Sequence, residues 1–262
     1  MLKTELKSTE YIKIKQNSTN SYGGSQMWFN AGEKGRENVI AGYGCGVVAA
    51  ADLILYLAKA EDEYITDLTR KMAADSEIDM AEYLEYLKSI ERSYGHVLNH
   101  IGMTGFSLAA AINRYFRKNE LCLKAVWKNM ALNSKTAICD IKQMLDRDIP
   151  VIISIPGVFV RSRALHMYRS EQTSVSAEKE RAYKYASFSG HYVTVTGILE
   201  NNLGDEILVI SSWGKKYYME LCEYERSVKT LHGVLACGMV KVTEISNPQR
   251  PIGIKINLTH RE

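Results

Sequence analysis

The most informative segment of this chain is Gly44-Cys45-Gly46-Val47-Val48-Ala49-Ala50-Ala51-Asp52-Leu53-Ile54-Leu55-Tyr56-Leu57. It is almost continuously apolar, which predicts a buried central helix from Cys45 to about Lys59. Cys45 lies in the first turn of this helix, directly after a glycine-rich approach. A helix N-terminus carries unpaired N–H groups and a partial positive charge, and both stabilise a thiolate. We therefore expect the pKa of Cys45 to be lowered if a cationic partner lies nearby.

The composition of the 262-residue chain is typical of a soluble globular domain, with 46% hydrophobic and 24% charged residues. A net charge of +3 with scattered Lys and Arg does not favour a nucleic-acid partner. The N-terminal segment 1–7 lacks the apolar region of a secretory signal, and no apolar run approaches the roughly 20 residues of a membrane span. These features predict a cytoplasmic protein without a membrane span.

The five cysteines form an odd set with no paired spacing, which argues against a disulfide framework. No Cys-x-x-Cys occurs, and the six histidines show no metal-ligand arrangement, so we expect neither a metal nor another cofactor. The cysteines other than Cys45 are expected to be buried small hydrophobic residues. They are Cys122, Cys139, Cys222 and Cys237.

The order of the expected elements indicates an α+β fold in a single domain spanning residues 1–262, with helices first and an antiparallel sheet later. A loop-rich lead-in (1–44) precedes a mainly helical half (45–148) and a sheet half (149–245), followed by a polar tail (246–262). Helices are expected at 45–59, 79–92, 107–117 and 134–146. Strands are expected at 11–15, 121–126, 151–155, 192–198, 207–210 and 234–242. The polar segment 161–189 interrupts the sheet half as an insertion, which we expect to border the site and influence substrate access.

A thiol hydrolase needs a nucleophile, a base, a group that orients the base, and donors for the oxyanion. Cys45 supplies the nucleophile, and its backbone N–H is a candidate oxyanion donor. His191, which begins a strand directly after Gly190, is the best candidate base among the histidines. The expected hairpin brings the end of the next strand beside the start of the His191 strand. A side chain near Ser211 is therefore expected within reach of the imidazole.

Four motifs occur in an order that resembles the papain-like cysteine peptidases. They are Gly44-Cys45-Gly46 with its apolar helix, Ile149-Pro150-Val151-Ile152-Ile153, Gly190-His191-Tyr192-Val193-Thr194-Val195-Thr196-Gly197, and Ser212-Trp213-Gly214. The chain looks most similar to the double-glycine leader peptidases of bacteriocin exporters and to their stand-alone bacterial relatives. The likeness covers roughly 24–218, without the helical segment before residue 120 and the insertion. His191 follows Cys45 by 146 positions, which also fits the papain-like spacing of about 130–150.

This resemblance implies a papain-like fold and cleavage of a peptide or amide bond by a Cys45–His191 pair. It places Ser211 at the orienting position, where the family has Asp or Asn; a serine hydroxyl can accept a bond from the imidazole Nδ1–H but carries no charge. Gln26 resembles the oxyanion glutamine of the stand-alone relatives. The expected cleft residues are Gly44, Gly46, Gly190 and Trp213, with Trp213 shielding the pair from water.

The sequence leaves three functions open. The leading hypothesis is a hydrolase acting on a peptide or protein substrate, and the second is an acyltransferase of the same fold in which an amine replaces water. The third is an inactive pseudo-peptidase that binds a peptide or protein partner, because the uncharged Ser211 is a weaker orienting group than a carboxylate. Other candidates for the orienting role lie at the far end of the hairpin; they are Asn201, Asn202 and Asp205.

Overall fold

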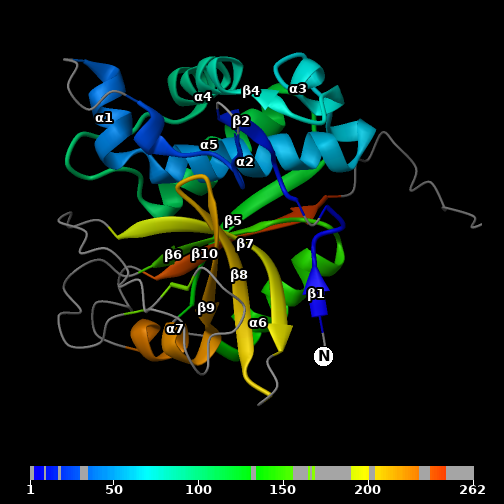
Figure 1. Ribbon diagram of the computed structural model, residues 1–262, viewed down its shortest axis with the longest axis vertical. Helices are drawn as coiled ribbons and strands as arrows, with labels where there is room; N and C mark the ends of the chain where they lie inside the picture. The colour runs from blue at the N-terminus through cyan, green and yellow to red at the C-terminus, as the bar shows by residue number, and fades with distance from the viewer. Residues whose placement is uncertain are drawn as a thin grey trace, which may run out of the picture.

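The fold is seen in a computed structural model that describes residues 3–8, 10–16, 19–29, 35–130, 134–155, 165, 167–168, 190–200, 204–229 and 237–245. Helices α1 to α5 lie on one side of a twisted antiparallel sheet, while α6 and α7 lie on the other (Figure 1). This arrangement confirms the expected α+β class. Most of the expected insertion, the tail, Asn201 and Asn202 lie outside the described residues.

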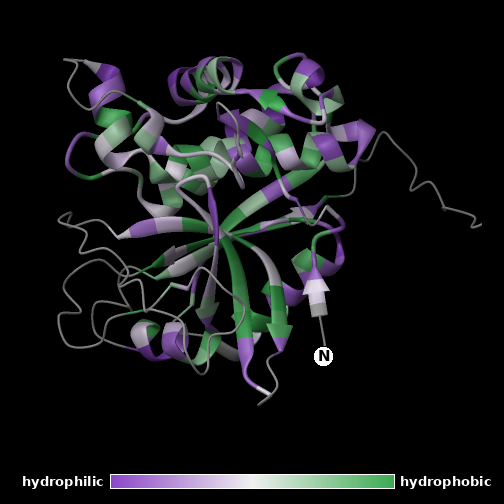
Figure 2. Ribbon diagram, viewed as in Figure 1, coloured by the Kyte–Doolittle hydropathy of each residue, from purple (hydrophilic) through white to green (hydrophobic). Residues whose placement is uncertain are grey.

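The central helix α2 (Cys45–Ala60) begins at the expected residue. Every residue from Gly46 to Ala58 is buried, because the helix packs against other helices on one side and against β6 and β7 on the other. Apolar residues run along α2 and along the central strands (Figure 2). The remaining helices are α1 (Arg36–Tyr43), α3 (Arg70–Ala74), α4 (Met80–Tyr94), α5 (Gly105–Lys118), α6 (Ser134–Asp146) and α7 (Leu221–Val228), with short 3-10 helices η1 (Gln26–Trp28) and η2 (Asp62–Tyr64).

The loop-rich lead-in also contains a helix, α1, which the sequence pattern did not indicate. This helix joins α2 at Gly44 with a bend of 85°. Among the described residues, no single helix has the length and apolar character needed to cross a bilayer. Only α1 and α2 taken together, as this bent pair, have that length and composition.

Within the described residues, seven strands form one antiparallel sheet in the order β5-β10-β6-β7-β8-β9, and β1 pairs with the far end of β7. The strands are β1 (Lys3–Glu5), β5 (Leu123–Asn129), β6 (Val151–Ile155), β7 (His191–Glu200), β8 (Glu206–Ser212), β9 (Lys215–Glu220) and β10 (Gly238–Glu244). A small second sheet contains β2 (Ile14–Gln16), β3 (Thr19–Asn20) and β4 (Ile78–Asp79). The sequence pattern indicated neither β9 nor α7.

The β7–β8 hairpin contains an irregularity that changes its register. Near the turn Gly197 pairs with Val209, whereas on the other side of the irregularity Val195 pairs with Ile210. Thr196 is therefore an extra residue in β7, which is the definition of a β-bulge. From this point to the end of β8 the pairing is shifted by one residue, and such a shift exchanges the two faces of a strand.

The bulge decides which serine shares a face with His191. Thr194 pairs with Ser211, and antiparallel partners project their side chains to the same face of a sheet. Because faces alternate along a strand, Ser211 lies with Thr194, and Ser212 lies on the face of Val193 and His191. In a hairpin without the bulge the assignment of the two serines would be reversed.

Candidate active site

The N-terminus of α2 meets the start of β7. Cys45 is the first residue of α2, with Gly44 as N-cap, and it is partly buried. Gly46 is buried beside Tyr192: a Cβ at Gly46 would lie 3.3 Å from the Tyr192 ring carbon Cδ2. His191 precedes Tyr192 as the first residue of β7. The packing of helix on strand thus brings together two residues that lie far apart in the sequence.

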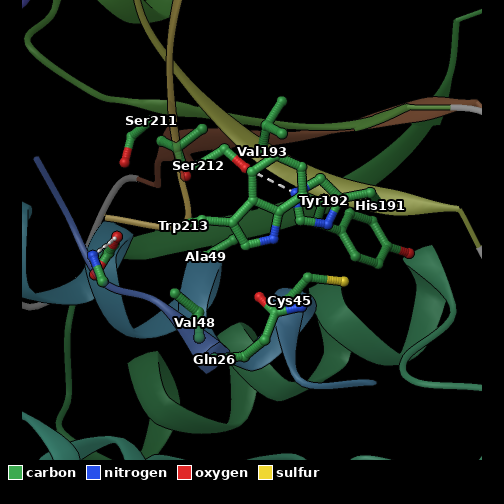
Figure 3. Close-up of a pocket in the computed structure, with 13 residues that line it drawn as sticks. Gln26, Cys45, Val48, Ala49, His191, Tyr192, Val193, Ser211, Ser212 and Trp213 are labelled. Atoms are coloured by element: carbon green, nitrogen blue, oxygen red, sulfur yellow. Dashed lines mark hydrogen bonds between the residues drawn. The ribbon is translucent and has the colours of Figure 1, made fainter. Parts of the chain in front are cut away.

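Two adjoining pockets meet at this point and share Gln26, Cys45, His191 and Tyr192 in their lining. The first pocket runs along α2 as far as Asp52. The second pocket is lined by exposed apolar side chains, by Tyr43 and by Gly190. Figure 3 shows the first pocket, with Cys45 and Gln26 on one side and His191 with Trp213 on the other. The predicted nucleophile and base therefore line the same cavity.

The imidazole of His191 is buried and held on two sides. Its Nε2 lies 2.8 Å from the hydroxyl Oγ of Ser212. The indole of Trp213 stacks on the ring, with centroids 4.3 Å apart and planes inclined by 10°. The other ring nitrogen is turned to the side of the pocket where Cys45 lies (Figure 3). These contacts fix the orientation of the imidazole relative to Cys45.

The predicted orienting residue Ser211 does not make this contact. Its hydroxyl donates to the carbonyl oxygen of Tyr22 at 2.7 Å, although Ser211 lines the same pocket. The bond to the imidazole belongs to Ser212 and is made at Nε2 rather than at Nδ1. The physical reason is the bulge at Thr196, which turns Ser211 to the opposite face. Asp205, the described member of the alternative orienting residues, lies at the turn end of β8, outside that strand.

The two-residue turn between β8 and β9 places Trp213 on the imidazole. Ser212 pairs with Lys215, and the intervening Trp213 and Gly214 have φ of 50° and 71°. Positive φ at both central positions is the conformation of a type I′ hairpin turn, and it is rare for a bulky residue such as tryptophan. The turn is held from outside, because the Gly214 N–H donates to the carbonyl of Gly24 at 2.9 Å.

Gln26 begins η1 and is only 6% exposed. The hydroxyl of Ser25 caps this short helix by accepting from the Met27 N–H at 3.1 Å. The Gln26 side chain ends beside Cys45 (Figure 3), and Gln26 lines both pockets. The candidate oxyanion donor is therefore next to the candidate nucleophile, although it precedes it by 19 positions in the sequence.

Burial dominates the electrostatics of Cys45 and His191. Burial raises the pKa of Cys45, while the backbone N–H groups of Tyr192, Gly46 and Cys45 itself lower it by less. Burial also lowers the pKa of His191 to about 3. The lowering that was expected with a cationic partner is not found, because His191 is uncharged and removal from water outweighs the helix N-terminus. Near neutral pH the pair consists of a thiol and an uncharged imidazole.

Asp52 is a feature of the site that the sequence analysis missed. It lies two turns after Cys45 on the same face of α2 and is 2% exposed. Its Oδ1 accepts from the Tyr83 hydroxyl at 2.6 Å, and its Oδ2 accepts from the Gly24 N–H at 2.9 Å. Burial raises its pKa to about 7, against the lowering effect of these two bonds. The sequence signal was a single carboxylate in an otherwise apolar helix.

The remaining cysteines only partly match their prediction. Cys237 is buried, but Cys139 and Cys222 are exposed and Cys122 is partly buried. Cys139 lies on the outer face of α6, and Cys222 in α7, where neither is needed to fill the core. Among the described residues, no group of three or more His, Cys, Asp and Glu side chains is arranged to hold a metal ion.

Comparison of the sequence with models of known protein families gives no match, and comparison with the curated proteins gives none either. The family resemblance drawn from the four motifs therefore stays a prediction.

We expect the Asp52→Asn variant to gain stability relative to the wild type as the pH rises. A carboxyl whose folded pKa is raised to about 7 stabilises the protein at low pH, and this contribution is lost as the pH rises through that value. The asparagine does not ionise, so the difference in unfolding free energy should grow by up to about 4 kcal/mol between about pH 4 and pH 8. Denaturant unfolding at both pH values measures it, and an unchanged difference would contradict the raised pKa.

Proposed function

We propose that this protein is a thiol-dependent hydrolase with a papain-like fold, which cleaves a peptide or amide bond. The observation that carries the proposal is the shared pocket of Cys45 and His191, with the imidazole oriented by Ser212 and covered by Trp213. A nucleophile, a base and a group that orients the base are the parts that covalent catalysis by a thiol requires.

In the proposed reaction the uncharged imidazole acts as general base. Nδ1 accepts the proton of Cys45 as the sulfur attacks the carbonyl carbon, and Nε2 donates its hydrogen to Ser212 Oγ. The imidazolium then protonates the leaving amine, and the acyl group stays on the sulfur as a thioester. Water attacks the thioester with His191 again as base, which releases the acid and restores the thiol. Because the ground-state pair is neutral, the charges develop only during attack.

The developing oxyanion needs donors in the same cavity. The Gln26 amide and the backbone N–H of Cys45 are the proposed donors, since both lie at the N-terminus of α2 where the helix dipole favours negative charge. Burial of the site strengthens these interactions, because few water molecules compete for the oxyanion.

The second pocket supports a peptide or protein substrate. Met27 and Ile101 line it beside Cys45, and these residues are 67% and 52% exposed. Large apolar side chains exposed at the mouth of a polar site are typical of surfaces that bind another molecule. A substrate peptide with apolar side chains next to the scissile bond would cover Met27 and Ile101.

We expect p-nitrophenyl acetate to acylate Cys45 about 100-fold faster than the exposed Cys139 at pH 7, because a positioned general base contributes about 10²–10⁴-fold. Peptide mapping of the acetylated protein measures both rates. Alkylation of Cys45 by iodoacetamide should instead keep rising with pH well above neutrality, since the pKa of this thiol is raised by burial. The His191→Ala variant is the control and should lose the preference for Cys45. Equal acylation of Cys45 and Cys139 in the wild type would refute the proposal.

The two neighbouring serines give a matched pair of variants. Ser212→Ala should slow acylation of Cys45 by roughly 3- to 10-fold, the value of one lost hydrogen bond to the imidazole. Ser211→Ala should slow it less, because that hydroxyl donates to the Tyr22 carbonyl rather than to His191. Initial rates with the same ester measure both effects. The opposite order would mean that Ser211 orients the imidazole.

A second function, a peptide-binding protein without turnover, is favoured by one observation. Ser212 carries no charge, so it stabilises an imidazolium less than a carboxylate does, and burial already disfavours that cation. Replacing Ser212 by Asp separates the two functions. A weakened hydrolase should deacylate the thioester faster in Ser212→Asp than in the wild type, as measured by the release of acetate. Absence of Cys45 acylation in both proteins would favour the binding function.

A further inference from the structure

Asp52 joins the helix of the nucleophile to the segment that carries Gln26. The helix and the segment both line the first pocket. The lining residues of α2 lie on one face of the helix, and they are Cys45, Val48, Ala49 and Asp52. A carboxyl group in this position is costly unless its oxygens are bonded. Asp52 meets this requirement with a backbone N–H of another segment and a hydroxyl of α4.

The bonded N–H belongs to Gly24, two residues before Gln26. The segment from Ser21 to Gly24 is also tied to the β8–β9 turn, because the Tyr22 N–H donates to the Gly214 carbonyl at 2.9 Å and the Gly214 N–H donates to Gly24. The Ser21 and Gly23 N–H groups also donate to the carbonyl oxygens of Ile14 and Ile12, at 2.9 and 2.8 Å. Asp52 adds to these contacts a direct bond between α2 and the Gly24 backbone.

The approach of this segment to Asp52 leaves no room for side chains. A Cβ at Gly23 would lie 2.7 Å from the Asp52 Oδ2 atom, and a Cβ at Gly24 would lie 1.9 Å from the Tyr83 hydroxyl oxygen. Both distances are far shorter than van der Waals contact, so the two glycines are required for the backbone to reach the carboxylate.

We propose that Asp52 is a positioning residue of this site: by accepting the Gly24 N–H it holds the Gln26 amide beside Cys45. The inference rests on the proposed hydrolase function, since Gln26 is an oxyanion donor only in that reaction. Asp52 acts through the backbone from Gly24 to Gln26, so its effect should appear in steps that develop an oxyanion and be absent from steps that do not.

Two reagents separate these steps at the same sulfur atom. Acylation by p-nitrophenyl acetate passes through a tetrahedral oxyanion, whereas alkylation by iodoacetamide is a displacement at carbon without one. Asp52→Leu keeps the bulk of the side chain but removes both acceptors. We expect it to lower the ratio of acylation to alkylation at Cys45 by about 10- to 100-fold, the scale of a misplaced catalytic group. Hydrogen exchange of the backbone from residue 21 to residue 29 should become faster.

Asp52→Asn is the conservative variant, because its amide oxygen can accept from Gly24 while its NH₂ group donates to the Tyr83 oxygen. Its acylation-to-alkylation ratio should lie within about 3-fold of the wild-type ratio, because a neutral hydrogen bond is only somewhat weaker than a charged one. Asp148→Leu is the matched control, since Asp148 is also buried and also accepts from a tyrosine hydroxyl and a backbone N–H. Its donors are the Tyr56 hydroxyl at 2.7 Å and the Lys7 N–H at 2.8 Å, so it does not contact the segment of Gln26. That variant should leave the ratio unchanged.

If Asp52→Leu does not fold, Asp52→Ala removes the same acceptors without placing an apolar side chain between Gly24 and Tyr83. A wild-type ratio together with wild-type exchange in these variants would overturn the inference, and so would an Asp52→Asn ratio as low as that of Asp52→Leu. If wild-type Cys45 is not acylated at all, the hydrolase proposal fails instead. Hydrogen exchange at residues 21–29 then decides by itself whether Asp52 positions this segment.

Discussion

The packing of α2 against β7 is the constraint on which the rest of the site depends. An almost wholly apolar helix must be covered on every side, and the sheet covers it along β6 and β7. Close packing of Gly46 against Tyr192 then fixes the helix N-terminus at the start of β7. Cys45 and His191 line the same pocket because each directly precedes one of these two contact residues. The position of the pair is therefore a consequence of how the core is buried.

The same burial sets the charge state of the site. Removal from water raises the pKa of Cys45 and of Asp52 and lowers that of His191. The helix N-terminus and the hydrogen bonds to Asp52 act in the opposite direction but are weaker than the loss of hydration. A buried neutral pair fits the general-base mechanism that we propose, in which charge appears only as the bond to the substrate forms and the proposed donor Gln26 already lines the pocket.

The amino-acid sequence alone determined the elements whose pattern is strong. The starts of α2 and α6 and the bounds of β6 follow from apolar runs and from the Pro150 break. The N-cap of α4 follows from Asp79, whose side chain accepts from two backbone N–H groups. The sequence pattern did not predict the short elements α1, α7 and β9. Their apolar and polar residues show no clear period, and such short elements form only where they pack against the long ones.

Only the tertiary structure decided the partners of the candidate residues. The choice of Ser212 over Ser211 depends on one extra residue at Thr196, which no composition or periodicity marks and which exchanges the faces of β8. The link from Asp52 to Gly24 joins residues from separate segments, and the raised pKa of Cys45 results from its burial in the folded protein. Local sequence fixes which residues can form a helix or a strand, whereas register and burial arise from contacts between segments distant along the chain.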